Sequence, residues 1–156
     1  MKRMQFERVL ETPIGKITLC ADEAGICDLK FGAQSDRADA SPLLDCARLE
    51  LEEYFAGRRR AFSVPLSIHG TPFQERVWHA LMEIPYGETI SYGELARRIG
   101  NEKACRAVGM ANHANRIPII IPCHRVVGAN GRLTGYGGGL EIKRILLETE
   151  GIDVKI

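Results

Sequence analysis

Residues 91–101, SYGELARRIGN, decide how the second half of the chain folds. Ser91 and Glu94 have the spacing of a capping box, which predicts that a helix begins after Ser91. Apolar residues then recur at helical spacing until Gly100, a residue type that commonly ends helices. The stretch therefore predicts one short helix.

A second short helix is predicted over residues 102–114, with Asn101 as its N-cap. Two short helices joined by Gly100 and Asn101 have the dimensions of a helix-turn-helix. The second helix is rich in small residues, which permit the close approach of either another helix or a shallow nucleic-acid groove. These small residues are Ala104, Ala107, Gly109, Ala111 and Ala114. Arg106 is the long cation among them.

Upstream of these helices, Thr71-Pro72-Phe73-Gln74 forms another capping box, with proline at the first helical position. The helix that follows carries Trp78 on its apolar stripe, so Trp78 is predicted to lie in the core. The hydrophobic pattern changes at this box. We therefore expect an N-terminal domain over residues 1–70 and a C-terminal domain over residues 71–156.

The N-terminal domain is predicted to be a small antiparallel sheet with one helix. Over residues 6–31 short β-branched and apolar runs alternate, with turn sequences at residues 12–15 and 22–25, which is typical of a three-stranded meander. Ser41 then begins a helix that Gly57 ends. The predicted fold class is α/β, in the mixed α+β sense.

The rest of the C-terminal domain is predicted to be mostly helical. Ala129-Asn130-Gly131 is a turn sequence after the Val126-Val127 strand, which predicts a short hairpin. A last helix with an apolar stripe follows and ends at Gly151.

The composition matches an ordinary globular protein. Of the 156 residues, 45% are hydrophobic and 26% are charged, which excludes disordered and low-complexity classes. The longest apolar runs fall far short of the roughly 20 residues that a membrane span needs, and the first residues do not form an apolar signal core. We therefore expect a soluble, cytoplasmic protein.

The net charge of +1 hides an uneven distribution. Residues 1–70 carry 10 basic and 11 acidic side chains, whereas residues 85–132 carry 7 basic and 3 acidic ones. A local basic stretch is the minimum that binding to a polyanion requires, and it is also common on a solvated surface. Charge alone leaves both interpretations open.

The five cysteines contain no C-x-x-C pair, which argues against a disulfide framework and against a zinc ribbon. Cys20 and Cys27 flank a predicted hairpin turn, and we expect two buried thiols there rather than a bridge. Neither a metal nor a cofactor is expected, because Cys20, Cys27, Cys46 and His69 lack a recognisable ligand spacing.

Residues 118–127, PIIIPCHRVV, carry the strongest chemical signal. The isoleucine run should be buried, and Pro122 restricts the backbone from which Cys123 emerges. A cysteine reacts as its thiolate, which at neutral pH needs a nearby cation, base or hydrogen-bond donor. His124 and Arg125 are such groups. From the thiol and the imidazole alone, a buried structural cysteine is the alternative.

The segment Ile121-Pro122-Cys123-His124-Arg125-Val126 resembles the signature of the O6-alkylguanine-DNA alkyltransferases, also called methylated-DNA-protein-cysteine methyltransferases. The resemblance covers roughly residues 71–151 and includes residues 85–92, 106–109, 112–115 and 135–140 in the same order. The N-terminal domain resembles the family in size and coarse pattern. The resemblance implies a DNA repair protein that flips a damaged guanine out of duplex DNA.

The resemblance further implies that Cys123 takes the alkyl group from O6 of guanine, and from O4 of alkylthymine. Each molecule would act once, because a thioether is not displaced by the small nucleophiles of a cell. His124 would act through a water as the base, oriented by Glu150. Asn115 would stabilise the turn that carries the nucleophile. Glu150 lies at the end of the last predicted helix, where a Glu is otherwise an ordinary surface residue.

Four residues correspond to the family's guanine contacts. Tyr92 would donate a hydrogen bond to the guanine and offset the negative charge that develops as the guanine leaves. Lys143 would support this tyrosine, and Val126 and Gly137 would line the base pocket. Gly137 falls where some relatives carry serine, so its backbone N–H is the donor that could meet O6.

The implied partner is double-stranded DNA, bound by a monomer. Arg106 would fill the stack vacated by the flipped base, with its helix in the minor groove. Asn101 would meet a phosphate, and Tyr92 would crowd the rotated phosphate of the flipped nucleotide. Recognition would depend on damage and not on base sequence.

Three other functions are alternatives. The first is a DNA-binding module that binds the lesion without transferring the alkyl group. Such modules lack the reactive cysteine, so the presence of Cys123 argues against this function. A transcription regulator would read the major groove, for which the alanine-rich helix offers few side chains. A cysteine hydrolase would need an oxyanion hole and a substrate cleft, which the sequence does not indicate.

Overall fold

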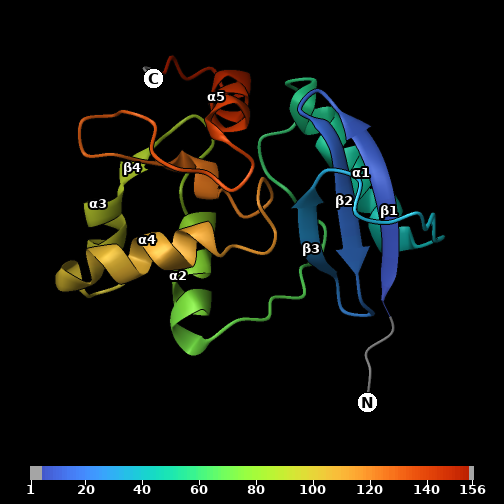
Figure 1. The fold of residues 1–156 in the computed structure, drawn as a ribbon, viewed down its shortest axis with the longest axis horizontal. Helices are drawn as coiled ribbons and strands as arrows, with labels where there is room; N and C mark the ends of the chain where they lie inside the picture. The colour runs from blue at the N-terminus through green and yellow to red at the C-terminus, as the bar shows by residue number, and fades with distance from the viewer. Residues whose placement is uncertain (1–4, 155–156) are drawn as a thin grey trace. The chain divides into compact units, whose positions relative to one another are not determined.

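The computed structural model describes residues 5–154, and the chain forms two compact units that divide between His69 and Gly70. Figure 1 shows that one unit contains a three-stranded sheet and that the other is mostly helical. None of the helices in the described residues has the length and apolar character needed to cross a membrane.

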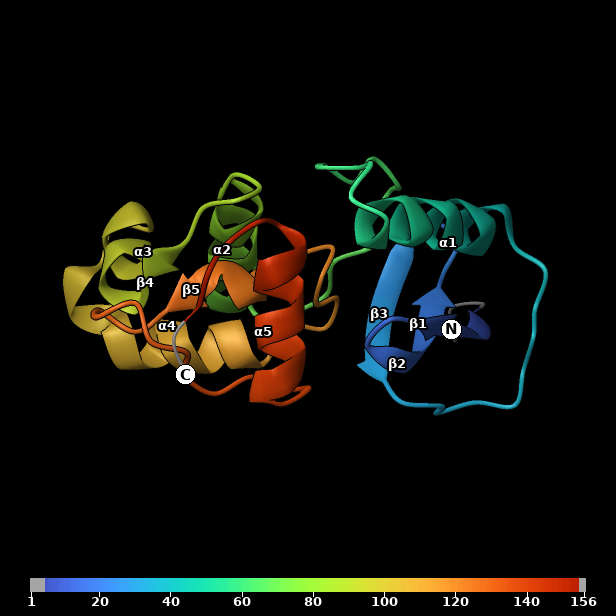
Figure 2. The ribbon, with the colours of Figure 1, turned by 90° about the horizontal axis from the view of Figure 1, so that it is seen from above.

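The N-terminal unit is an antiparallel sheet covered by a helix. Strands β1 (Phe6–Thr12), β2 (Gly15–Ala21) and β3 (Ile26–Phe31) lie side by side in chain order, which confirms the predicted meander. Helix α1 (Pro42–Phe55) lies across one face of this sheet (Figure 2). The buried residues between the two layers include Leu19, Leu29, Leu44, Leu51 and Tyr54.

Side-chain hydrogen bonds fix the ends of these elements. Ser41 accepts a hydrogen bond from the first turn of α1, and Gly57 lies just beyond the end of the helix with a φ of 75°. Asp22 accepts hydrogen bonds from the N–H groups of Ala24 and Gly25, which closes the turn between β2 and β3. The helix ends and the turn were predicted from these same residue types and are confirmed.

The Asp22 carboxylate also ties the sheet to the segment that follows α1. Ser67 donates to its Oδ2 at 2.6 Å, and Nε2 of His69 lies 2.8 Å from the same serine hydroxyl. Gly25 leaves room for this segment, because a Cβ there would lie 2.4 Å from the Pro65 carbonyl oxygen. Burial raises the pKa of Asp22, but the hydrogen bonds from Ser67 and from the turn outweigh burial and lower it to about 2.

Cys20 and Cys27 are both buried, unbridged thiols, as expected. The strand register shifts between Cys20 and Ala21, and Cys27 donates a hydrogen bond to the Cys20 sulfur. This bond lowers the pKa of Cys20 and raises the pKa of Cys27. The pair belongs to the core of the N-terminal unit.

The C-terminal unit contains four α-helices and two 3-10 turns among the described residues. The helices are α2 (Pro72–Met82), α3 (Tyr92–Arg98), α4 (Cys105–His113) and α5 (Leu140–Thr149), and the 3-10 turns are η1 (Glu102–Ala104) and η2 (Cys123–Arg125). Helix α2 begins with the predicted capping box of Thr71 and Gln74. Trp78 is buried as predicted, and its Nε1 donates to the Ala111 carbonyl, which holds α4 against α2.

Helices α3 and α4 form the predicted helix-turn-helix around Gly100, with Ser91 and Asn101 at the predicted N-cap positions, but the side-chain hydrogen bonds at these caps differ in part from the prediction. Ser91 accepts from the N–H of Glu94, whereas the Glu94 carboxylate pairs with Arg97 and Arg98 instead of completing the capping box. The Asn101 side chain makes no cap hydrogen bond to the described backbone. The reason is that the chain enters α4 through η1, whose tighter turn follows Asn101 directly.

The strand at residues 126–127 also differs in its partner. Strands β4 (Ile90–Ser91) and β5 (Val126–Val127) pair in parallel, so β5 takes its partner from far along the chain. The predicted hairpin is reduced to a turn, in which Gly131 donates to the Gly128 carbonyl and Gly128 donates to the Arg132 carbonyl. A pattern of two apolar residues cannot distinguish a local partner from a distant one.

We expect Asp22→Ala to lower the free energy of unfolding by about 1–3 kcal/mol, because Ser67 and two backbone N–H groups lose a buried acceptor. The contribution of Asp22 is present above the unfolded pKa of 3.8 and is lost as the pH falls through about 2. Urea unfolding as a function of pH measures both effects.

The control for this variant is Asp36→Ala, since Asp36 is exposed in the same unit. The control should change stability by less than about 0.5 kcal/mol. Equal losses in the two variants at pH 7 would show that the Asp22 hydrogen bonds do not stabilise the unit.

Candidate active site

The loop before Cys123 is held in place by Asn115. Nδ2 of Asn115 donates to the Ile121 carbonyl at 2.8 Å, and its Oδ1 accepts from the Ile117 N–H at 3.0 Å. Between these contacts Ile119 has a φ of 75°, a conformation that costs a β-branched residue about 1–3 kcal/mol. The isoleucines are buried, as predicted, and their burial offsets this cost. The loop thus presents Cys123 from a fixed backbone.

The Cys123 thiol is buried at the start of η2. Burial raises its pKa, whereas the neighbouring Asn115, the positive charge of Lys143 and the Tyr136 side chain act in the opposite direction. The net result is a raised pKa, so the protonated thiol predominates at neutral pH. A base is therefore needed to form the nucleophile.

The His124 ring is fully buried, and its Nε2 lies 2.6 Å from Oε2 of Glu150. Burial lowers the pKa of His124 and outweighs the hydrogen bond with Glu150, which raises it. The imidazole is therefore neutral at pH 7, with its proton on Nε2 facing the carboxylate. Nδ1 makes no hydrogen bond to a protein group in the described residues, so its lone pair is free to take a proton.

Glu150 lies at the C-cap of α5 and accepts hydrogen bonds from several directions. Besides His124, it accepts two from Arg125, at 2.9 and 3.1 Å, and one from the Gly87 N–H at 3.1 Å. Arg125 also donates to the Ile84 carbonyl at 2.6 Å. The guanidinium therefore neutralises Glu150, and the cation that lowers the pKa of Cys123 is Lys143.

Lys143 is fully buried within α5. Its Nζ donates to the Val126 carbonyl at 2.8 Å and to the Thr134 carbonyl at 3.4 Å. Burial lowers its pKa to about 8, and the neighbouring Cys123 acts in the opposite direction. Sequence reasoning missed its closeness to the thiol. The available signal was its position one turn before Leu146, on the buried face of the helix.

Tyr92 begins α3 and is half-buried. Its hydroxyl lies 2.7 Å from Oγ1 of Thr134, and a Cβ at Gly109 would lie 3.8 Å from its ring, so the ring packs on α4. Lys143 reaches Tyr92 through the Thr134 residue and not directly. Thr134 was not singled out in the sequence, because its loop has no recognisable pattern.

The remaining predicted guanine contacts lie on β5 and on the loop before α5. Val126 is fully buried, and its carbonyl accepts from Lys143. Gly137 is exposed, and a Cβ there would meet nothing within 4 Å, so the loop itself does not require glycine at this position.

The small residues of α4 lie in two environments. Ala111 is buried under Trp78 and Gly109 lies against Tyr92, so part of the helix packs closely against other helices. Arg106 and Ala107 are exposed instead. Met110, one turn after Arg106, is 70% exposed. Asn101 is exposed as well, so this side of the helix-turn-helix is open to a partner.

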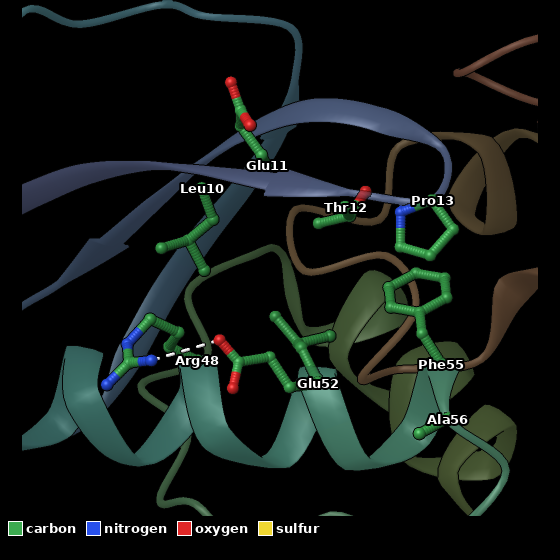
Figure 3. A pocket seen from close by; sticks show the side chains of 9 residues that line it. Leu10, Glu11, Thr12, Pro13, Arg48, Glu52, Phe55 and Ala56 are labelled. Atoms are coloured by element: carbon green, nitrogen blue, oxygen red, sulfur yellow. Dashed lines mark hydrogen bonds and ion pairs between the residues drawn. The ribbon is translucent and has the colours of Figure 1, made fainter.

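A pocket of about 360 Å³ lies in the N-terminal unit, between the β1–β2 hairpin and α1 (Figure 3). Arg48 and Glu52 form an ion pair at its edge. The pocket contains no thiol or imidazole, so it is separate from the chemistry of Cys123. The described residues contain no cluster of three or more metal-ligating side chains.

Two stretches of the chain match known families. Residues 72–152 match the "6-O-methylguanine DNA methyltransferase, DNA binding domain", and residues 6–68 match the "6-O-methylguanine DNA methyltransferase, ribonuclease-like domain". The chain belongs to the methylated-DNA–protein-cysteine methyltransferase family. Its similarity to the family therefore extends through the N-terminal unit, where the sequence had suggested only a coarse resemblance.

Relatives in this methyltransferase family match the chain along nearly its whole length. The methylated-DNA–protein-cysteine methyltransferase of Methanosarcina acetivorans is 50% identical, over 94% of this chain and 98% of its own. The constitutive methyltransferase of Bacillus subtilis is 46% identical, over 97% and 99%.

Solved methyltransferase structures have the same fold. The O6-methylguanine methyltransferase of Mycobacterium tuberculosis superposes with a TM-score of 0.86 at 47% identity, covering 94% of this chain and 93% of that one. The crystal structure of the M. tuberculosis protein in complex with DNA gives the same TM-score and identity, with coverages of 93% and 92%.

We expect Glu150→Ala to lower the free energy of unfolding by about 3–5 kcal/mol, because the variant leaves the buried Arg125 without its partner. Urea unfolding measures the loss. Glu148→Ala is the matched control, since Glu148 ends the same helix but is exposed and pairs at the surface with Arg144. The control should cost less than about 1 kcal/mol. If Glu150→Ala is no worse than the control, the buried carboxylate does not hold the site together.

Proposed function

We propose that this protein repairs DNA by moving the alkyl group of O6-alkylguanine, and of O4-alkylthymine, to its own Cys123. The observation that carries the proposal is a buried thiol whose pKa is raised by burial and lowered in part by Asn115 and by the charge of Lys143, and which precedes a neutral His124 whose Nδ1 makes no hydrogen bond in the described residues. Family membership supports it, because relatives at 46–50% identity are named for this reaction.

The reaction begins when the thiol proton leaves Cys123 and passes through a water to Nδ1 of His124. Glu150 stabilises the imidazolium that forms, and Lys143 stabilises the thiolate. The sulfur then bonds to the alkyl carbon while the bond from that carbon to O6 breaks. The electron pair stays on the guanine, which takes up a proton. The product is a stable thioether, so each molecule reacts once.

The base is held between α3, β5 and the loop before α5. Tyr92 donates a hydrogen bond to the guanine and offsets the charge on the departing base. Val126 and Gly137 line the pocket, and the Gly137 N–H donates to O6. The exposed position of Gly137 supports this assignment, since a base can approach its backbone.

The DNA is bound by α4 in the minor groove, where close backbone approach is needed. The exposed Arg106 enters the stack and replaces the flipped base, and the exposed Met110 lies beside it. Asn101 contacts a phosphate. The protein acts as a monomer on genomic DNA, which in a cell without a nucleus lies in the cytoplasm.

We expect incubation with a duplex that contains O6-methylguanine to add one methyl group to each protein molecule, on Cys123. Intact mass and peptide mapping measure the number and the position. Cys123→Ala should bind the alkylated duplex and take up no methyl group, because nucleophile and DNA-binding helix are separate segments. Repeated turnover, or methylation of the exposed Cys105 instead, would contradict the proposal.

We expect Arg106→Ala to slow transfer from duplex DNA at least about tenfold at saturating DNA, because the flipped state loses the side chain that replaces the base. Transfer from the free O6-alkylguanine base needs no flipping and should be unchanged. Single-turnover rates on both substrates make the comparison. Arg48→Ala removes one charge from the N-terminal unit and is the control. Equal losses on duplex and free base would exclude the proposed role of Arg106.

A further inference from the structure

The phenol of Tyr92 already has a hydrogen-bond partner before any base is bound. Its oxygen lies 2.7 Å from Oγ1 of Thr134, and either hydroxyl can be the donor. A phenol carries one proton, and the proposed function requires that proton for the guanine. The direction of this hydrogen bond therefore decides whether Tyr92 is ready to recognise the base.

Thr134 is itself held on three sides. A Cβ at Gly128 would lie 3.4 Å from its Cγ2, so its methyl group packs against the Gly128 backbone. Its carbonyl accepts a hydrogen bond from the buried ammonium of Lys143, which also binds the Val126 carbonyl of β5. Lys143 thus holds the Thr134 backbone, packing against Gly128 restricts its side chain, and its hydroxyl faces Tyr92.

We propose that Thr134 is a positioning residue for the transfer reaction, which donates its hydroxyl proton to the Tyr92 oxygen and so leaves the phenolic proton free for the departing guanine. The proposal rests on the proposed function. Thr134 then donates its hydroxyl proton to the Tyr92 oxygen. Tyr92 in turn donates its phenolic proton to the guanine, which gains negative charge as it leaves. Hydrogen bonds arranged in such a chain strengthen one another.

Two features of the loop support this assignment. Thr134 and Tyr136 are separated by one residue; Thr134 binds Tyr92, and the Tyr136 side chain acts to lower the pKa of Cys123. One short segment therefore acts both on the thiol that attacks and on the phenol that meets the leaving base. Lys143 contacts this segment and lowers the pKa of Cys123, which links the two ends of the reaction.

The test compares Thr134→Val, which removes the hydroxyl at nearly constant shape, with Thr134→Ser, which keeps it. At saturating methylated duplex, Thr134→Val should slow the single-turnover transfer by about tenfold, the size expected for one hydrogen bond to a group that gains charge. The duplex concentration at half-saturation should be unchanged. Thr134→Ser should restore most of the rate.

A double-mutant cycle with Tyr92→Phe shows whether Thr134 acts through the phenol. In the Tyr92→Phe background, Thr134→Val should have no further effect on the rate. The reaction of Cys123 with iodoacetamide releases no guanine, so Thr134→Val should leave its rate unchanged. A structural role would instead change the half-saturating concentration, the iodoacetamide rate or the urea midpoint.

The possible failures are distinguishable. If the wild-type protein transfers no methyl group, the proposed function is wrong and the role of Thr134 falls with it. If the wild-type protein transfers and Thr134→Val equals it, or if the effects of Thr134→Val and Tyr92→Phe are additive, the role of Thr134 alone is overturned.

Discussion

The buried carboxylate of Glu150 joins three segments that are far apart in the chain. It closes α5 and accepts hydrogen bonds from His124 and Arg125 in η2 and from the Gly87 backbone after α2. A buried charge is tolerated only when it is paired and fully hydrogen-bonded, and this carboxylate meets that condition. The position of η2, and with it the direction of Cys123, therefore depends on one side chain at a helix end.

The same carboxylate determines how charge is distributed around the thiol. Burial keeps the His124 imidazole neutral, and because Glu150 accepts the hydrogen bond from its Nε2–H, the lone pair of the ring lies on Nδ1. Lys143 is then the cation that acts on Cys123. Burial keeps the pKa of the thiol raised, and a thiol that stays protonated is oxidised less readily than a thiolate.

Features that depend on neighbouring residues could be predicted from the sequence, and features that depend on distant partners could not. The meander, the Ser41 cap and the Thr71 capping box follow from local turn and cap chemistry, and the buried isoleucine run follows from its composition. The parallel partner of β5 and the contacts of Lys143 and Thr134 join segments that no short pattern relates. Asn101 lies at the N-cap position that the sequence predicts, but its side chain makes no cap hydrogen bond, because a 3-10 turn follows it in place of an α-helical turn.

The small residues of α4 lie on two different sides of the helix, one packed against the protein and one exposed. On the protein side, the Tyr92 ring lies against Gly109, and the Ala111 carbonyl accepts a hydrogen bond from Trp78. A Cβ at residue 109 would lie 3.8 Å from the ring, an ordinary contact distance, so the ring would also tolerate alanine there. On the open side, Ala107 leaves the backbone accessible beside Arg106. Under the proposed function, in which Arg106 inserts into the DNA, α4 would carry Tyr92 on its other side, so that binding of the duplex and positioning of the phenol would be coupled through one helix.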